Sequence, residues 1–174
     1  HVRSRRQRQM CIRDRIILLM IIVGGLTRLT ESGLSMVDWR LFMGTIPPLS
    51  HGDWLKVFED YKQYPEYQIK NINMTLSEFK YIFWWEYGHR VLGRLIGIIF
   101  IIPFIYFALK KYFSNEELYS YSFLLFLGGA QGIIGWWMVK SGLDVNPYVS
   151  HLRLAVHLII CLLYTSDAAD EIVR

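Results

Sequence analysis

The chain has 174 residues, of which 53% are hydrophobic and 16% aromatic, and its formal net charge is +4. Its apolar residues come in long runs, which makes the composition too apolar for a soluble domain and excludes a disordered chain. Two cysteines are too few for a disulfide-dense scaffold. An excess of basic residues can indicate nucleic-acid binding, so the position of these residues along the chain decides whether a nucleic-acid-binding protein remains possible.

The basic charge lies mainly at one end of the chain. Six of the 19 basic residues are arginines within residues 1–15, and three acidic residues fall within 164–174. Residues 16–163 therefore carry a net charge of only about +1, and no nucleic-acid partner is expected. Both end segments, HVRSRRQRQMCIRDR and YTSDAADEIVR, resemble translated sequencing-adaptor read-through. We predict that both are non-native and that residues 16–163 form the protein proper; a native basic arm and acidic tail are the alternative.

Four apolar segments follow one another along this core. Residues 16–26 are too few to cross a bilayer alone, whereas 81–109 and 118–139 have the length of a membrane span. The fourth segment, 149–163, ends at the predicted foreign tail. The sequence thus predicts an all-α, polytopic membrane protein with a four-helix transmembrane bundle.

The connections between these segments predict the orientation in the membrane. The first, 27–80, is long and carries 6 basic and 7 acidic residues, and the second opens with Lys110 and Lys111. Short basic loops remain on the cytoplasmic or mitochondrial matrix side. The long first loop is therefore expected on the opposite, outer side, together with the connection 140–148.

Local patterns predict further elements. Residues 50–53 (SHGD) form a capping-box pattern and predict a short amphipathic helix on the membrane surface or over the mouth of a site. Residues 75–78 (TLSE) repeat the pattern, so the helix that contains 81–109 is expected to begin before the membrane. In the third segment, small residues predict close helix packing, and Gln131 beside them is expected to make a polar contact in the bundle. The apolar face of the short helix is Trp54, Val57, Phe58 and Tyr61, and the small residues are Gly128, Gly129, Gly132 and Gly135.

Four ionisable residues interrupt the second apolar segment: Glu86, His89, Arg90 and Arg94. Ionisable groups inside a bilayer are costly, so these residues are functional candidates. Glu86 and His89 are three residues apart, which places them about 60° apart around a helix and about 4.5 Å apart along its axis. The two side chains are therefore expected on one side of the helix.

A second intramembrane histidine, His157, falls in the fourth segment. Like His89, it lies eight residues past the expected membrane entry, about 12 Å deep at 1.5 Å per residue. Two imidazoles at one depth on parallel helices are the arrangement of bis-histidine haem ligation. Hydrogen-bonded structural histidines, or a proton relay, are the alternative. His51 is expected to be an ordinary loop residue, and His151 is expected in solvent, with a position near the haem as the alternative.

Three arginines near these histidines, Arg90, Arg94 and Arg153, are candidates for charge-assisted bonds to haem propionates. Pairing with Glu86, or snorkelling towards the membrane surface, is the alternative. The core contains no glycine-rich phosphate loop, zinc-ligand spacing or nucleophile triad. The residues alone thus predict a membrane protein that handles haem or protons.

Five strings occur in a specific order along the core: GGLTRLTESGLSMVDW (24–39), GTIPPLS (44–50), FWWEYGHRVLGRLIG (83–97), LGGAQGIIGWWMVKSGL (127–143) and VSHLRLAVHL (149–158). In this combination they resemble the heme A synthase family. That family oxidises a methyl group of heme O to a formyl group, giving heme A for cytochrome c oxidase. The resemblance implies an eight-helix protein of two similar four-helix halves, of which this chain is the N-terminal half.

The resemblance also implies roles for single residues. Glu86 matches the carboxylate linked to catalysis, and His89 and His157 match the haem-ligand histidines of the half that holds the substrate, heme O. Arg28 falls in the T-R-L-T-x-S-G motif, where a structural or propionate contact is expected. The heme b cofactor belongs to the C-terminal half, so this chain alone is expected to be inactive.

Partners and location follow from the same resemblance. Residues 27–80 contain no cysteine, as in the mitochondrial and proteobacterial branch, so the bacterial plasma membrane or the mitochondrial inner membrane is implied. The implied partners are heme O, membrane lipid, heme O synthase, an electron donor and further copies of the chain in a homo-oligomer.

Two other functions remain open: a b-type cytochrome that passes electrons without oxidising a substrate, and a non-catalytic bundle such as a transporter or assembly scaffold. The placement of Glu86 one turn from His89 favours the oxidation, because electron transfer alone needs no carboxylate there.

Overall fold

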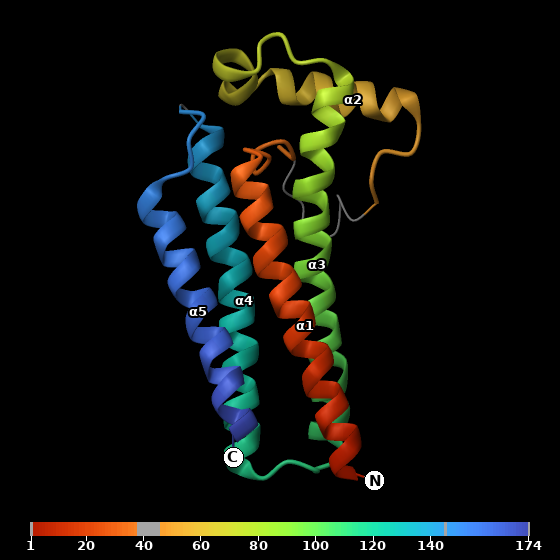
Figure 1. Cartoon of the computed structure of the whole chain (residues 1–174), viewed down its shortest axis with the longest axis vertical. Helices are drawn as coiled ribbons and strands as arrows, with labels where there is room; N and C mark the ends of the chain where they lie inside the picture. Colours follow the sequence, from red (N-terminus) through yellow and green to blue (C-terminus); the bar gives the residue numbers. More distant parts are fainter. Residues whose placement is uncertain (1, 38–45, 145, 174) are drawn as a thin grey trace.

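The structure is a computed structural model that describes residues 2–37, 46–144 and 146–173, with side chains for 15–37, 46–144 and 146–163. The predictions that concern the arginines before residue 15 and the acidic tail therefore lie outside the described side chains. Four long helices run side by side with alternating direction, so that both chain termini lie at one end (Figure 1). They are α1 (Val2–Leu29), α3 (Leu76–Leu109), α4 (Asn115–Leu143) and α5 (His151–Val173).

The opposite end of the bundle is covered by the long first connection (Figure 1). This connection contains α2 (His51–Lys62) and a short π-helical turn, η1 (Glu66–Lys70). Within the bundle, α1 packs mainly against α3 and α4 packs mainly against α5. The predicted all-α architecture is confirmed.

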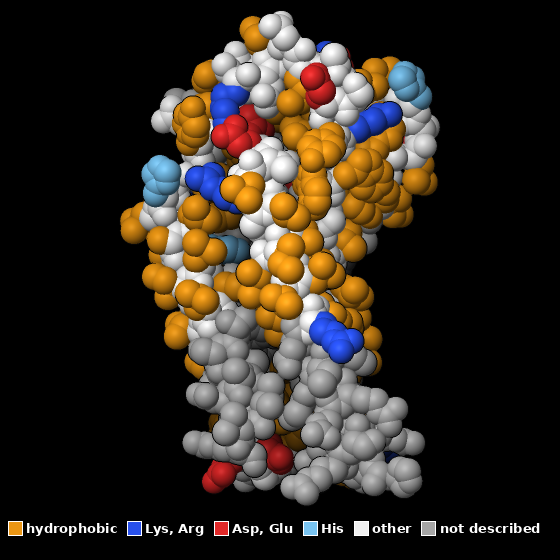
Figure 2. All heavy atoms as spheres, in the orientation of Figure 1, with side chains coloured by type: hydrophobic (Ala, Val, Ile, Leu, Met, Phe, Trp, Pro, Cys, Tyr) orange, Lys and Arg blue, Asp and Glu red, His pale blue; other side chains and the backbone are white. Residues whose placement is uncertain are grey.

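Two of the described helices, α3 and α4, are long and apolar enough to cross a membrane. Residues 151–163 of α5 form a shorter apolar stretch. Hydrophobic side chains cover the described middle of the bundle face, and most charged side chains on it gather towards the α2 end (Figure 2). Four spans remain the prediction for the whole bundle, because the described residues supply two of full length.

The helices continue through both predicted boundaries with foreign sequence. Residue 15 lies inside α1, and residue 163 lies inside α5. A continuous helix does not distinguish native from foreign residues, since apolar and charged residues alike can extend an existing helix. The boundaries therefore stay a prediction.

The aromatic cap is the core cluster where α2 meets the start of α3: Met36, Trp54, Phe58, Tyr61, Phe79, Ile82 and Phe83. Ser50 caps α2, and its hydroxyl accepts from the Asp53 amide while the Asp53 carboxylate accepts from the Ser50 amide. The amphipathic pattern of α2 and its capping box are confirmed, as is the second box, Thr75 with Glu78. Burial of each large apolar side chain in this cap is worth about 1.5–3 kcal/mol.

Some elements differ from the prediction. The third apolar segment starts earlier than expected because Ser114 and Glu117 form an unpredicted capping box ahead of α4. The π-turn η1 was not predicted. The glycine face of α4 is not a continuous packing surface: nothing lies within 4 Å of a Cβ placed on Gly129 or Gly132, whereas Gly135 faces the imidazole of His157.

Candidate functional site

Glu86 is the most enclosed ionisable residue of the membrane-spanning part, with 3% of its surface exposed. Its Oε2 atom accepts hydrogen bonds from the Ser35 hydroxyl at 2.7 Å and from the Met36 amide at 2.8 Å. Its Oε1 atom accepts from Arg90 Nη2 at 2.5 Å. A buried carboxylate is tolerated when paired and hydrogen-bonded, and Glu86 satisfies both conditions.

Arg90 serves two groups at once. Besides its ion pair with Glu86, it donates to the Met36 carbonyl oxygen at 3.0 Å. One helical ion pair therefore holds the amide and the carbonyl of the same loop residue. This geometry fixes the segment after α1 against α3, and it commits Arg90 to Glu86 and the loop.

His89 lies one turn beyond Glu86 on α3, packed against α1. A Cβ placed on Gly24 would meet its Nε2 atom at 3.1 Å, so the absence of a side chain at Gly24 provides the space for this ring. His157 of α5 is near enough to act electrostatically on His89. The two predicted histidines therefore lie within electrostatic range of each other, each packed against a glycine of a neighbouring helix.

The prediction that His89 and His157 lie equally deep refers to distance from the membrane surface, so residue counts from the helix ends do not test it directly. His89 lies 13 residues beyond the start of α3, whereas His157 lies six residues beyond the start of α5. The start of α3 rises well above that of α5 and joins the cap (Figure 1). The extra length of α3 reduces this difference, and the matched depth of the two histidines stays a prediction.

His157 is held by Gln131 of α4. The Gln131 side-chain nitrogen lies 3.2 Å from His157 Nε2 and donates to the His157 carbonyl oxygen at 3.0 Å. The polar contact predicted for Gln131 is therefore confirmed. When the amide donates to Nε2, the ring proton resides on Nδ1, which is the tautomer that can later bind a metal through Nε2.

Three buried polar atoms of the described side chains have no hydrogen-bond partner: Arg94 Nη1, Gln131 Oε1 and His157 Nδ1. An unsatisfied buried polar atom costs about 1–3 kcal/mol, so such atoms call for a functional explanation. A haem would use an imidazole nitrogen for its iron and a guanidinium for a carboxylate. The chemistry of His89, His157 and Arg94 fits such a group.

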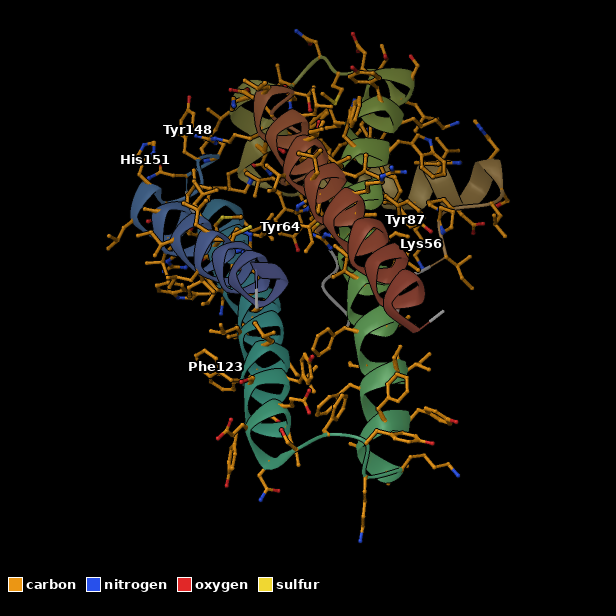
Figure 3. The ribbon with its side chains drawn as sticks, turned by 60° about the horizontal axis from the view of Figure 1, so that its bottom comes forward. Lys56, Tyr64, Tyr87, Phe123, Tyr148 and His151 are labelled. Atoms are coloured by element: carbon orange, nitrogen blue, oxygen red, sulfur yellow. The ribbon has the colours of Figure 1, made fainter. Side chains whose placement is uncertain are left out.

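The remaining predicted residues lie apart from this cluster. Arg153 donates to the Trp137 carbonyl oxygen at 2.8 Å and stacks over the Trp137 ring, 4.5 Å from its centroid. Arg28 is exposed at the end of α1. His51 is exposed at the start of α2, and His151 is exposed and points away from the bundle at the start of α5, as expected (Figure 3).

The capped end of the bundle contains a buried carboxyl group that the sequence patterns did not single out. Glu66 in η1 is 2% exposed and accepts from the Tyr61 hydroxyl at 3.0 Å, which in turn accepts from the Asn71 amide at 2.8 Å. Burial raises the pKa of Glu66 to about 7, and the charge of Glu86 adds to the rise. A glutamate in a polar loop carries no sequence signal of burial, because its enclosure depends on the packing of η1 against α2.

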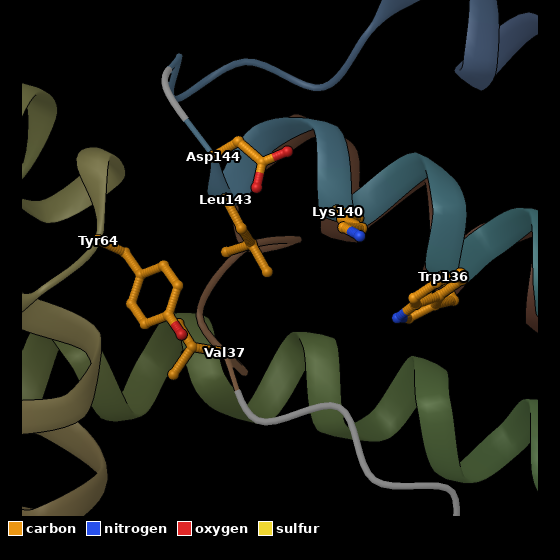
Figure 4. A pocket seen from close by; sticks show the side chains of 6 residues that line it. All are labelled: Val37, Tyr64, Trp136, Lys140, Leu143 and Asp144. Atoms are coloured by element: carbon orange, nitrogen blue, oxygen red, sulfur yellow. The ribbon is translucent and has the colours of Figure 1, made fainter.

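A small cavity of about 240 Å³ opens between the loop segments and the C-terminal end of α4 (Figure 4). This volume is below the range of about 300–1,000 Å³ in which drug-sized ligands bind, so the cavity does not have the size of a haem site. Its lining residues are Val37, Tyr64, Trp136, Lys140, Leu143 and Asp144.

Comparison with known proteins gives the family. The model of the COX15-CtaA family, described as cytochrome oxidase assembly protein, matches residues 12–169. The chain belongs to this family. It is accordingly an integral membrane protein of the polytopic, all-α kind. The match extends a few residues beyond both predicted boundaries with foreign sequence.

Individual relatives are similar over most of the chain. The heme A synthase of Nitrosospira multiformis is 53% identical over 143 residues, which are 82% of this chain and 40% of the relative. That of Flavobacterium psychrophilum is 53% identical over 145 residues, 82% of this chain and 43% of the relative. That of Bradyrhizobium diazoefficiens is 52% identical over 148 residues, 85% of this chain and 41% of the relative. The chain thus spans about two fifths of the length of these relatives, and no solved structure matches it.

Proposed function

We propose that the chain is the substrate-binding half of a membrane oxidoreductase that converts the methyl group of heme O to the formyl group of heme A. Family membership and the name carried by relatives about 53% identical to the chain support the reaction. The observation that supports the site is the placement of His89 within electrostatic range of His157 and one helical turn from the enclosed carboxylate Glu86. The proposal places the chemistry within the bundle, below the aromatic cap.

In this proposal, His89 and His157 hold the iron of the substrate haem, one from α3 and one from α5. The haem iron supplies the oxidising chemistry when heme O is bound. Arg94, whose Nη1 atom is buried without a partner, binds a haem propionate. Arg153 and Arg28 contribute to propionate binding only if their side chains leave the positions described above.

Glu86 acts on protons in this proposal. A carboxylate near the methyl group can accept a proton or stabilise positive charge that develops during the oxidation. Arg90 keeps this carboxylate in place through the pair on Oε1, while Ser35 and the Met36 amide hold Oε2. The site therefore fixes both oxygens before the substrate enters.

The proposal assigns the rest of the reaction to partners. A second, C-terminal half carries heme b, an electron donor reduces the protein, and heme O synthase delivers the substrate; assembly of several copies is compatible with the exposed apolar faces. The long first connection lies on the outer side of a bacterial plasma membrane or mitochondrial inner membrane. The segments 1–15 and 164–174 are foreign to this protein.

The test uses the complete reading frame that contains this sequence, expressed in a bacterium that makes heme O but lacks heme A. Extraction and chromatography of the haems measure conversion. We expect heme A from the unmodified protein, none from Glu86→Gln, and loss of the bound-haem spectrum in His89→Ala and His157→Ala. Bound haem with no conversion in the unmodified protein would instead identify a b-type cytochrome, and absence of bound haem would identify a non-catalytic bundle.

A further inference from the structure

Ser35 is a fully buried hydroxyl between two acceptors. Its Oγ lies 2.7 Å from Glu86 Oε2 and 3.2 Å from the Ser32 carbonyl oxygen, and none of its surface is exposed. A serine hydroxyl has one proton to donate and two lone pairs with which to accept. Ser35 can therefore donate to only one of these two oxygens at a time, and the shorter distance favours Glu86.

The two acceptors make Ser35 suitable for both protonation states of Glu86. While Glu86 is ionised, Ser35 donates to Oε2. When a proton is placed on Oε2, the direction of this bond can reverse: Glu86 donates to Ser35 Oγ, and the Ser35 proton turns to the Ser32 carbonyl oxygen. The carboxyl oxygen Oε2 and the Ser35 hydroxyl stay bonded to each other in both states, which avoids the cost of an unsatisfied carboxyl group.

The other groups around Glu86 cannot make this reversal. The Met36 amide and the Arg90 guanidinium are donors only, so neither can accept a proton from a protonated Glu86. Tyr61 and Glu66 lie within electrostatic range of Glu86, but they hydrogen-bond to each other. Ser35 is thus the acceptor that the described surroundings offer to a proton on Oε2.

We propose that Ser35 is a positioning residue that lets Glu86 take up and release a proton inside the bundle, by exchanging its own donor bond between Glu86 and the Ser32 carbonyl oxygen. This role rests on the proposed function of Glu86 and extends it to the segment after α1. The same hydroxyl that orients the carboxylate thereby accommodates its change of charge.

The test compares Ser35→Ala with Ser35→Cys in the complete reading frame, using heme A formation as the assay. Ser35→Ala leaves a proton on Oε2 without an acceptor, so we expect kcat to fall about tenfold or more with KM for heme O unchanged. The solvent deuterium isotope effect on kcat should increase, because proton transfer at Glu86 then limits the rate. Ser35→Cys, which keeps a weak donor and acceptor, should give an intermediate kcat.

Thr27→Val is the matched control. Thr27 is also buried, and its hydroxyl donates to backbone carbonyl oxygens, including that of Trp85 on α3, without touching Glu86. We expect its kcat within twofold of the unmodified protein. If Ser35→Ala retained full kcat while Glu86→Gln was inactive, the role of Ser35 would be wrong and that of Glu86 would stand. If Glu86→Gln still formed heme A, the proposed function of Glu86 would fail first.

Discussion

At the scale of single residues, each candidate ligand histidine faces a glycine of a neighbouring helix: His89 faces Gly24, and His157 faces Gly135. An alanine at either position would place a methyl group little more than 3 Å from the ring. These glycines thus contribute to the site because the absence of their side chains leaves room for the two imidazole rings. Neither pairing can be read from the sequence, because the partners are far apart along the chain.

Gly24→Ala is predicted to weaken haem binding. Its Cβ would lie 3.1 Å from His89 Nε2, so the ring must shift by a few tenths of an ångström and the nitrogen proposed to bind iron moves with it. Gly25→Ala is the control, since nothing lies within 4 Å of a Cβ there. Spectral titration of the chain with haem should show weaker binding for Gly24→Ala and unchanged binding for Gly25→Ala. Equal affinities would contradict the assignment of His89 as a ligand.

Arg90→Met is predicted to destabilise the protein by about 3–5 kcal/mol, because it leaves the Glu86 charge buried without its ionic partner. Adding Glu86→Gln to the same chain should recover most of this loss, since the uncompensated charge is then gone. Lys62→Met, which breaks the exposed pair with Glu59, should leave the stability almost unchanged, because water screens an exposed ion pair. Denaturation in detergent micelles measures the free energy of unfolding of the unmodified protein, the two single variants and the double variant. A small loss for Arg90→Met would argue against a buried pair.

At the scale of elements, the capping boxes and the apolar faces of the helices were predictable because they depend on residues close in sequence. Ser50 with Asp53, and Thr75 with Glu78, identify the starts of α2 and α3 within one residue. The π-turn η1 and the enclosure of Glu66 were not predictable. They follow from the packing of Tyr61 over the turn, which no periodicity encodes.

The cap is predicted to become less stable as pH rises from about 4.5 to about 7. The folded protein raises the pKa of Glu66 to about 7 from its ordinary value near 4.5, so the folded state holds the proton more tightly than the unfolded state. The stability gained from that proton is complete below pH 4.5 and is lost as pH passes through 7, at up to about 1.4 kcal/mol per pH unit.

Tryptophan fluorescence during chemical denaturation at a series of pH values tests this dependence, because Trp54 is buried in the same cap. In Glu66→Gln the side chain cannot ionise, so the slope between pH 4.5 and 7 should disappear. A slope that persists in Glu66→Gln would assign the dependence to another group.

At the scale of the whole molecule, composition and hydropathy predicted an all-α membrane protein, and the strings that resemble heme A synthases predicted the family that the comparisons show. The approximate site was also foreseeable, since costly ionisable residues in apolar helices stand out. What the sequence could not supply is which arginine pairs with Glu86 and which remains unsatisfied, because that choice depends on the path of the loop after α1.

The orientation of the bundle gives a prediction at the same scale. The basic residues Lys110 and Lys111 should keep the connection between α3 and α4 on the inner side, with α2 outside. In a variant without the natural cysteines, His51→Cys should react with a membrane-impermeant thiol reagent in intact cells, and Tyr112→Cys only after permeabilisation. The reverse pattern would invert the proposed topology.

The hydrogen bonds from α3 to the Met36 backbone have a consequence for sequence variation in the segment that follows α1. Glu86 and Arg90 hold the amide and the carbonyl of that residue, so they recognise where the backbone passes and are indifferent to which side chain it carries. Replacement of Met36 by leucine should thus preserve both contacts. Insertion of one residue between Ser32 and Ser35 would instead present a different peptide group to the ion pair, so position 36 should tolerate a change of side chain far better than this segment tolerates a change of length.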